Sequence, residues 1–222
     1  MIGFDEQLEL FKLIGMMLKE KIECLVIGGS AMLFYNAKDS TKDIDLVFMD
    51  KKERDELKEV LYKIGFNPKP QIKIFEHYET AKDKPIIMER KDTRFDLFVK
   101  EVICFKISDN ILNRIKEVHE FNNLIIKLVA PEDIILLKCA TEREKDRIDA
   151  AELIKKFNIN WNIIINESLH QTKIGKNIFP VFLYDFLTEL KENLRLEIPK
   201  DVLIRLRKIS EDEMIKVMKK RK

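Results

Sequence analysis

The sequence is poor in the two residues that most often interrupt regular structure. Glycine and proline account for only six residues each among 222. Because both concentrate in turns and loops, their scarcity predicts short connections and a chain dominated by helices and strands. With 45% hydrophobic residues the chain can build a core, and its length corresponds to one or two domains of ordinary size.

Cysteine is also rare, and long hydrophobic runs are missing. The three cysteines, Cys24, Cys104 and Cys139, are odd in number and form no CxxC pair, so the sequence indicates neither a disulfide framework nor a zinc site. No apolar run approaches the roughly 18 residues of a membrane span. The first turns of the chain are acidic, whereas a secretory signal begins with basic residues. We therefore expect a cytoplasmic protein with no membrane partner.

Charge of one sign does not dominate either. The 41 basic and 39 acidic side chains leave a formal charge of +2, which excludes a polycation or an acidic disordered tail. A nucleic-acid partner is still allowed, because charges can be segregated locally on a surface of small net charge.

The first 130 residues mix strand and helix patterns. Short apolar runs that end in turn residues are typical of buried strands, and apolar residues at three- and four-residue spacing indicate helices. The pattern predicts helices over Asp5–Lys19, Ala31–Tyr35 and Lys51–Ile64, strands over Cys24–Ile27, Asp43–Phe48, Arg94–Val99 and Leu124–Val129, and weaker extended segments over Ile72–Phe75 and Ile86–Arg90.

The remaining residues show only helical patterns. Pro131 suits the first position of a helix, and the acidic residues after it suit the first turn. We therefore predict an α/β (α+β) domain over residues 1–130 and an all-helical domain over 131–222. The predicted helices of the second part are Pro131–Thr141, Asp146–Phe157, Trp161–Gln171, Ile178–Leu194, Lys200–Ile209 and Glu211–Lys220.

The segment Val26–Phe48, VIGGSAMLFYNAKDSTKDIDLVF, carries the clearest functional signal. Alternation along its second strand places Asp43 and Asp45 on one face, where two carboxylates repel each other unless a cation offsets them. Hard oxygen ligands suit Mg²⁺, which takes one or two carboxylates and completes its shell with phosphate oxygens. The turn Gly28-Gly29-Ser30 before a helix offers backbone N–H groups and a hydroxyl to such phosphates.

A third acidic residue lies in the apolar strand Arg94–Val99. Asp96 shares its face with Arg94, so a carboxylate triad forms if this strand neighbours the Asp43 strand. Such a triad suits phosphoryl-group transfer, with the third acid helping to deprotonate the attacking hydroxyl. An ion pair between Asp96 and Arg94 or Lys100 is the alternative interpretation.

These motifs resemble the nucleotidyltransferase superfamily of the DNA polymerase β type. GGSA, TKDIDL, FDLF and the stretch KCATEREKDRIDAAELI are similar, in order, to AbiEii-like toxin nucleotidyltransferases of type IV toxin–antitoxin systems and their uncharacterised relatives. The resemblance covers roughly residues 20–157. It implies a nucleotidyltransferase fold, in which a small mixed sheet is flanked by helices and followed by a helical domain.

The resemblance also implies roles for individual residues. Asp43, Asp45 and Asp96 would hold Mg²⁺ or Mn²⁺, with Asp96 as third ligand or general base, and Gly28, Gly29 and Ser30 would bind the phosphates of ATP or another NTP. These assignments follow the motif positions alone.

The helical half would contribute further residues by the same resemblance. Lys138 would neutralise the triphosphate, Arg143 would assist it, and Asp146 matches an acidic position that toxin members need. The competing interpretation is a solvated helix face with ion pairs such as Arg143 with Asp146. Relatives often carry Arg two residues before the Thr of the TKDID-like segment, where this chain has Asp39 beside Lys38.

The resemblance implies transfer of an NMP unit from an NTP to an RNA acceptor, a tRNA 3′ end, by a toxin with a cognate antitoxin protein as partner. Two alternatives stay open. The acceptor is a small molecule, as in antibiotic-modifying nucleotidyltransferases, or a protein side chain; or the chain is a non-catalytic partner that binds nucleotide or RNA. Retention of all three carboxylates in the sequence speaks against the last.

Overall fold

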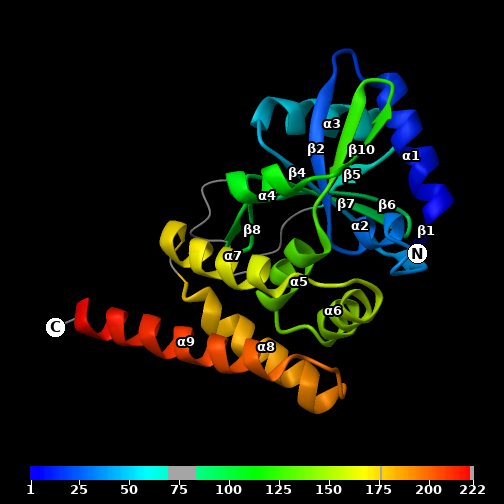
Figure 1. Cartoon of the computed structure of the whole chain (residues 1–222). Coiled ribbons are helices and arrows are strands. Elements are labelled where there is room, and N and C mark those ends of the chain that lie inside the picture. The colour runs from blue at the N-terminus through cyan, green and yellow to red at the C-terminus, as the bar shows by residue number, and fades with distance from the viewer. Residues whose placement is uncertain (70–83, 176, 221–222) are drawn as a thin grey trace. The chain divides into compact units, whose positions relative to one another are not determined.

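The computed structural model describes residues 1–69, 84–175 and 177–220 (Figure 1). By its internal contacts the chain divides into two compact units. The first comprises Met1–Ile103 with Ile107–Ala130, and the second comprises Cys104–Lys106 with Pro131–Lys222. Apart from the three-residue segment Cys104–Lys106, the division falls between Ala130 and Pro131.

A mixed sheet forms the centre of the first unit. Its strands lie in the order β10-β11-β2-β4-β7-β6-β5. The pairs β11/β2 and β4/β7 are parallel, whereas β10/β11, β2/β4, β7/β6 and β6/β5 are antiparallel. The strands of this unit are β1 (Ile2–Gly3), β2 (Ile22–Ile27), β3 (Ser40–Thr41), β4 (Asp43–Phe48), β5 (Asn67–Pro68), β6 (Ile86–Arg90), β7 (Thr93–Val99), β8 (Glu101–Val102), β10 (Glu117–Phe121) and β11 (Leu124–Leu128).

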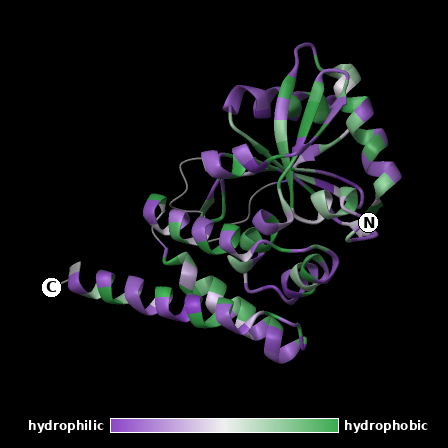
Figure 2. Cartoon of the chain, viewed as in Figure 1, coloured by the Kyte–Doolittle hydropathy of each residue, from purple (hydrophilic) through white to green (hydrophobic). Residues whose placement is uncertain are grey.

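Four helices accompany this sheet among the described residues: α1 (Phe4–Met17), α2 (Gly28–Phe34), α3 (Lys51–Lys63) and α4 (Asp109–Arg114). Helix α1 packs on β10 and β11 and touches α3, which packs on β4, β6 and β7, so the two cover one face of the sheet (Figure 1). Under them lies an apolar layer that includes Phe11, Phe48, Phe66 and Phe95, all fully buried. Figure 2 shows the hydrophobic residues concentrated along the central strands.

Local sequence sets the ends of α3, which connects β4 to the edge of the sheet. The Asp50 carboxylate accepts a hydrogen bond from the Lys52 backbone N–H at 2.7 Å, which satisfies a donor left free at the helix N-terminus. The helix ends at Lys63, two residues before Gly65, whose φ of +91° suits a residue without a side chain.

The second unit is helical except for β9 (Phe105–Lys106). Helix α5 packs against α6, α7 and α8, and α8 packs along α9. The amide of Gln171, on α7, pairs with the backbone of Lys106 through its oxygen at 2.9 Å and its nitrogen at 2.7 Å. The helices are α5 (Pro131–Cys139), α6 (Glu144–Lys156), α7 (Trp161–Ile174), α8 (Phe179–Asn193) and α9 (Lys200–Lys220).

The structure confirms the predicted fold class, a mixed sheet flanked by helices and followed by helices alone. Strand β10 and helix α4 are absent from the sequence prediction, and the predicted segment Ile72–Phe75 lies outside the described residues. The prediction of two C-terminal helices, Lys200–Ile209 and Glu211–Lys220, is wrong. The hydroxyl of Ser210 donates to the backbone carbonyl of Leu206 at 2.8 Å, so this polar residue is accommodated inside one continuous helix. Over the described residues no helix is both long enough and apolar enough to cross a membrane.

Candidate active site

The register of two parallel strands brings the predicted carboxylates together. Strands β4 and β7 are neighbours, and Asp45 lies directly opposite Asp96, with Asp43 opposite Arg94. Paired residues of neighbouring strands point to the same face, so all four side chains share one face of the sheet. The alternate residue Ile44 is fully buried, so it turns to the opposite, apolar face. The predicted juxtaposition of the Asp96 strand with the Asp43 strand is thereby confirmed.

Arg94 is the cation of this cluster. Its Nη2 donates to Asp96 Oδ2 at 2.7 Å, and its Nε lies 3.2 Å from Asp43 Oδ1. Partial burial of the guanidinium opposes its charge, but Asp96, Asp43 and Asp45 outweigh that effect and raise the pKa of Arg94 above its usual value. The predicted ion pair between Arg94 and Asp96 is therefore present, on the same face as the carboxylate cluster.

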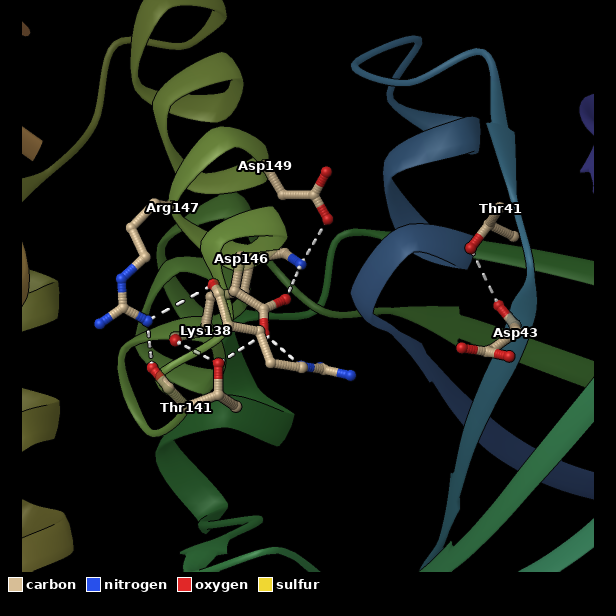
Figure 3. A network of polar contacts seen from close by, with 8 residues as sticks. Thr41, Asp43, Lys138, Thr141, Asp146, Arg147 and Asp149 are labelled. Atoms are coloured by element: carbon tan, nitrogen blue, oxygen red, sulfur yellow. Dashed lines mark hydrogen bonds and ion pairs between the residues drawn. The ribbon is translucent and has the colours of Figure 1, made fainter. Parts of the chain in front are cut away.

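The turn from β2 into α2 packs directly against these carboxylates. Gly28 has a φ of +59°, and a Cβ on it would lie 2.7 Å from Asp45 Oδ2. A Cβ on Gly29 would lie 2.6 Å from Thr41 Oγ1, the hydroxyl that donates to the backbone carbonyl of Asp43 at 3.1 Å (Figure 3). The two glycines thus leave room for side chains of the β3–β4 segment as well as for close approach to the backbone.

Ser30 differs from the sequence prediction in the direction of its side chain. Its hydroxyl is fully buried and donates to Gln7 Oε1 at 2.6 Å, while Gln7 Nε2 donates to the backbone carbonyl of Ser30 at 3.2 Å. The hydroxyl that the sequence assigns to a phosphate therefore binds α1 in this arrangement. Gln7, which the sequence analysis did not identify, holds the start of α2 through these two hydrogen bonds.

At the position where relatives often carry Arg, this chain has Asp39, and the basic side chain beside the Gly28–Gly29 turn is that of Lys38. Asp39 is exposed, whereas the side chain of Lys38 passes over Gly29, with its Cδ 3.7 Å from where a Cβ would stand. The position at which relatives often carry Arg is thus acidic here, and its neighbour supplies the basic side chain.

The donor set suits a divalent cation held by two carboxylates. Asp43 and Asp45 offer hard oxygen ligands on one partly exposed face, which is the chemistry that Mg²⁺ and Mn²⁺ prefer. Across residues 1–69, 84–175 and 177–220, no group of three or more His, Cys, Asp or Glu side chains is arranged to hold a metal ion. The geometry fits a site completed by phosphate oxygens better than a closed cage of three carboxylates.

Within the second unit, Lys138 forms a buried cluster with two acids of α6 (Figure 3). Its Nζ donates to Asp146 Oδ1 at 2.8 Å and to Asp149 Oδ2 at 2.6 Å, and all three side chains are nearly inaccessible to solvent. The alternative of a solvated helix face is therefore wrong for these residues. The sequence analysis missed Asp149, although its spacing of three residues from Asp146 places both acids on one helix face.

Further contacts fix the Asp146 carboxylate. Its Oδ2 accepts hydrogen bonds from the Thr141 hydroxyl and, at 2.8 Å, from Arg143 Nε. Burial is the largest single influence on Asp146 and favours its neutral form, but Lys138, Thr141 and Arg143 together outweigh burial and lower the pKa of this carboxyl. Asp146 is therefore held ionised, and the predicted pair between Arg143 and Asp146 is present.

Arg147, on α6, contacts the loop that carries Thr141 and lies next to the Lys138 cluster. Its guanidinium donates to the backbone carbonyl of Thr141 and to Glu189 Oε2, and it lies 5.2 Å from the centre of the Phe186 ring. These contacts join the loop between α5 and α6 to α8, so the Lys138 cluster belongs to the framework of the helical unit.

The sequence matches a known family over most of its length. Residues 4–187 match the model of the family described as nucleotidyltransferase of unknown function (DUF6036). No curated protein matches the chain.

Three solved structures match the chain at low sequence identity. They are the antibiotic-resistance factor ANT(2'')-Ia (15% identity, TM-score 0.42, covering 85% of this chain and 94% of that one), an antigenic nucleotidyltransferase-like protein from Paracoccidioides brasiliensis (17%, 0.40, 70% and 77%) and a protein from H. pylori described as a nucleotidyltransferase (14%, 0.42, 96% and 95%).

Proposed function

Because the chain belongs to this family of nucleotidyltransferases, we propose that it transfers an NMP unit from an NTP to a hydroxyl group with the help of Mg²⁺ or Mn²⁺. The observation that carries the proposal is the register of β4 and β7, which gathers Asp43, Asp45 and Asp96 on one face beside the Gly28 turn. Nucleotidyl transfer needs such a gathering, because the triphosphate brings several negative charges that a cation must neutralise.

The residues have distinct roles in this reaction. Asp43 and Asp45 hold the cation, which supplies charge neutralisation to the triphosphate, and backbone N–H groups of the Gly28–Gly29 turn contact the phosphates. The acceptor oxygen forms a bond to the α-phosphorus, the bond from that phosphorus to the α,β-bridging oxygen breaks, and pyrophosphate leaves. Asp96 receives the proton of the acceptor hydroxyl.

In the helical unit, Asp146 and Asp149 hold the ammonium group of Lys138, so this proposal gives Lys138 a structural role in place of the triphosphate contact that the resemblance implies. Arg143 is exposed on one side of this cluster, so it is a basic side chain that a phosphate group can reach.

The acceptor in this proposal is RNA, a tRNA 3′ end, and the biological role is that of a toxin with a cognate antitoxin. Support for this finer assignment comes from the sequence similarity of the TKDIDL and KCATEREKDRIDAAELI segments to AbiEii-like toxins. The small net charge is compatible with RNA, because binding then depends on local basic residues and weakens as salt is raised.

Incubation with each labelled NTP, Mg²⁺ and total tRNA tests the proposal. Wild-type protein should label the RNA, and Asp43→Asn should reduce labelling by on the order of 10³-fold, since removal of a metal ligand costs about 4 kcal/mol of transition-state stabilisation. Asp92→Asn is the matched control, because Asp92 is an exposed carboxylate in the turn between β6 and β7. It should label RNA as wild type does.

Other outcomes distinguish the alternatives. Label that appears on a small metabolite or on protein would replace RNA as the acceptor and keep the chemistry. Nucleotide binding without transfer to any fraction would contradict the enzyme assignment and favour a non-catalytic nucleotide-binding protein.

A further inference from the structure

The Arg94 guanidinium lies among the carboxylates that the proposed function assigns to the metal ion and to the proton acceptor. It contacts Asp96 Oδ2 at 2.7 Å and Asp43 Oδ1 at 3.2 Å, and these two acids come from different strands. We infer that Arg94 is a positioning residue that competes with the divalent cation for these carboxylate oxygens, and so sets the affinity of the site for metal. The inference rests on the proposed function, because it takes the carboxylate face to be the metal site.

Electrostatics explains why a basic residue is needed on this face. Asp43, Asp45 and Asp96 would repel one another across neighbouring strands, and like charges directly opposite each other destabilise a sheet. A guanidinium is planar and carries several donors in a fixed fork, so it can hold two carboxylates at once, which an ammonium group does less well. Arg94 therefore offsets the repulsion between Asp43 and Asp96, the two acids that it contacts.

The same contacts make Arg94 a competitor. Asp96 Oδ2 accepts a guanidinium N–H and so has less electron density to offer a metal ion, and Arg94 Nε, which lies 3.2 Å from Asp43 Oδ1, takes up space that a metal ion at that oxygen would need. The Arg94 side chain is about one-third exposed, which lets it move without disturbing the core. Once displaced, it remains beside the site as a cation that can contact phosphate.

Two substitutions separate competition for oxygens from a simple loss of positive charge. Arg94→Gln removes both the charge and the fork, whereas Arg94→Lys keeps the charge and removes the fork. If Arg94 acts only through its field, Arg94→Lys should bind metal as wild type does. If it competes for the oxygens, Arg94→Lys should already bind metal more tightly.

The experiment is a titration of the purified full chain with Mn²⁺ alone, followed by electron paramagnetic resonance. We expect Arg94→Gln to bind Mn²⁺ on the order of 10-fold more tightly than wild type, within the usual range of coupling between two sites, with Arg94→Lys in between. Lys127→Gln is the matched control, since Lys127 pairs with Glu23 on strands β11 and β2 of the same sheet. It should leave the affinity unchanged.

Each result decides the inference. Equal Mn²⁺ affinity in wild type, Arg94→Lys and Arg94→Gln would overturn the inference and leave the proposed function standing. Tighter Mn²⁺ binding by Arg94→Gln alone would have the same two consequences, because Arg94 would then act only through its charge. Mn²⁺ binding by none of the three would overturn it together with the metal dependence of the proposed function. If Arg94→Gln does not fold because its carboxylates repel, the comparison of Arg94→Lys with wild type still decides, and the melting temperature of each variant reports folding.

Discussion

The two units of this protein each contain a cluster in which one basic side chain is held by aspartates, and the clusters differ in exposure. In the sheet unit the side chains of Arg94 and Asp43 are 34% and 26% exposed, whereas in the helical unit those of Lys138 and Asp146 are 7% and 4% exposed. Exchange of a partner is inexpensive where water already reaches the charges and costly where it does not. The Arg94 cluster, called the open cluster below, can therefore exchange its basic side chain for a ligand. The Lys138 cluster, called the closed cluster, retains its basic side chain as part of the fold.

The largest difference should follow from removing the cation of each cluster. Lys138→Met leaves Asp146 and Asp149 buried without their ammonium partner, and such a loss typically costs about 3–5 kcal/mol of folding stability. Arg94→Gln removes a partly exposed pair with Asp43 and the hydrogen bond to the less exposed Asp96, and should cost about 2 kcal/mol. Urea unfolding followed by circular dichroism measures both. Equal losses in the two variants would contradict the distinction between a closed and an open cluster.

A hydroxyl deletion in each cluster provides a smaller, matched comparison. Thr141 donates to the buried, ionised carboxylate of Asp146, whereas Thr41 donates to the neutral backbone carbonyl of Asp43. Because hydrogen bonds to charged groups contribute more than those to neutral ones, Thr141→Val should cost about 2 kcal/mol and Thr41→Val about 1 kcal/mol. The urea concentration at the unfolding midpoint of each variant, compared with wild type, measures the two losses. A larger loss for Thr41→Val would contradict the ranking.

Acid should weaken the closed cluster in a way that identifies Asp146. Burial opposes its charge, but Lys138, Thr141 and Arg143 hold its pKa below the ordinary value of 3.8. The folded state therefore binds the proton less readily than the unfolded chain, so the stabilisation from Asp146 is fully present above that value and is lost as the pH falls through the lower, folded pKa.

Unfolding free energies measured by urea titration between pH 3 and 7 test this. Asp146→Asn should be less stable at neutral pH and should show a shallower decline toward acid than wild type. Parallel declines for the two proteins would contradict a lowered pKa for Asp146.

Much of the sheet could be predicted because its central strands carry their own signal. Asp43–Phe48 and Arg94–Val99 alternate strongly, since one face of each must pack under helices. Strand β10 could not be recognised in this way. Its residues Glu117–Phe121 are mostly exposed and carry no strong apolar pattern, and pairing with β11 together with packing against α1 holds them in place.

The candidate site shows the same division between local and long-range information. The Asp-x-Asp pattern and the Gly-Gly turn are contained in one segment, so their chemistry could be recognised from sequence. The contact of Arg94 with Asp43 depends on the register between β4 and β7, and the direction of the Ser30 hydroxyl depends on Gln7 from α1. Partners that are distant in sequence leave no periodic signal, and these are the contacts that the sequence analysis missed.

Two glycines with positive φ separate backbone strain from site geometry. Gly28 and Gly65 both have positive φ, at +59° and +91°, so alanine at either position should cost about 1 kcal/mol through the backbone. A Cβ on Gly28 would lie 2.7 Å from Asp45 Oδ2, whereas a Cβ on Gly65 would meet only the flexible Arg90 side chain at 3.6 Å. Gly28→Ala must therefore displace a carboxylate of the site, and Gly65→Ala need not.

Measured together, the two variants should lose similar stability in urea while only Gly28→Ala loses nucleotidyl transfer and Mn²⁺ binding. A fall in transfer by both would mean that general stability limits activity. Full transfer by Gly28→Ala would mean that the close approach of the turn to Asp45 is not needed for the reaction. The open cluster would then depend on the register of β4 and β7 alone.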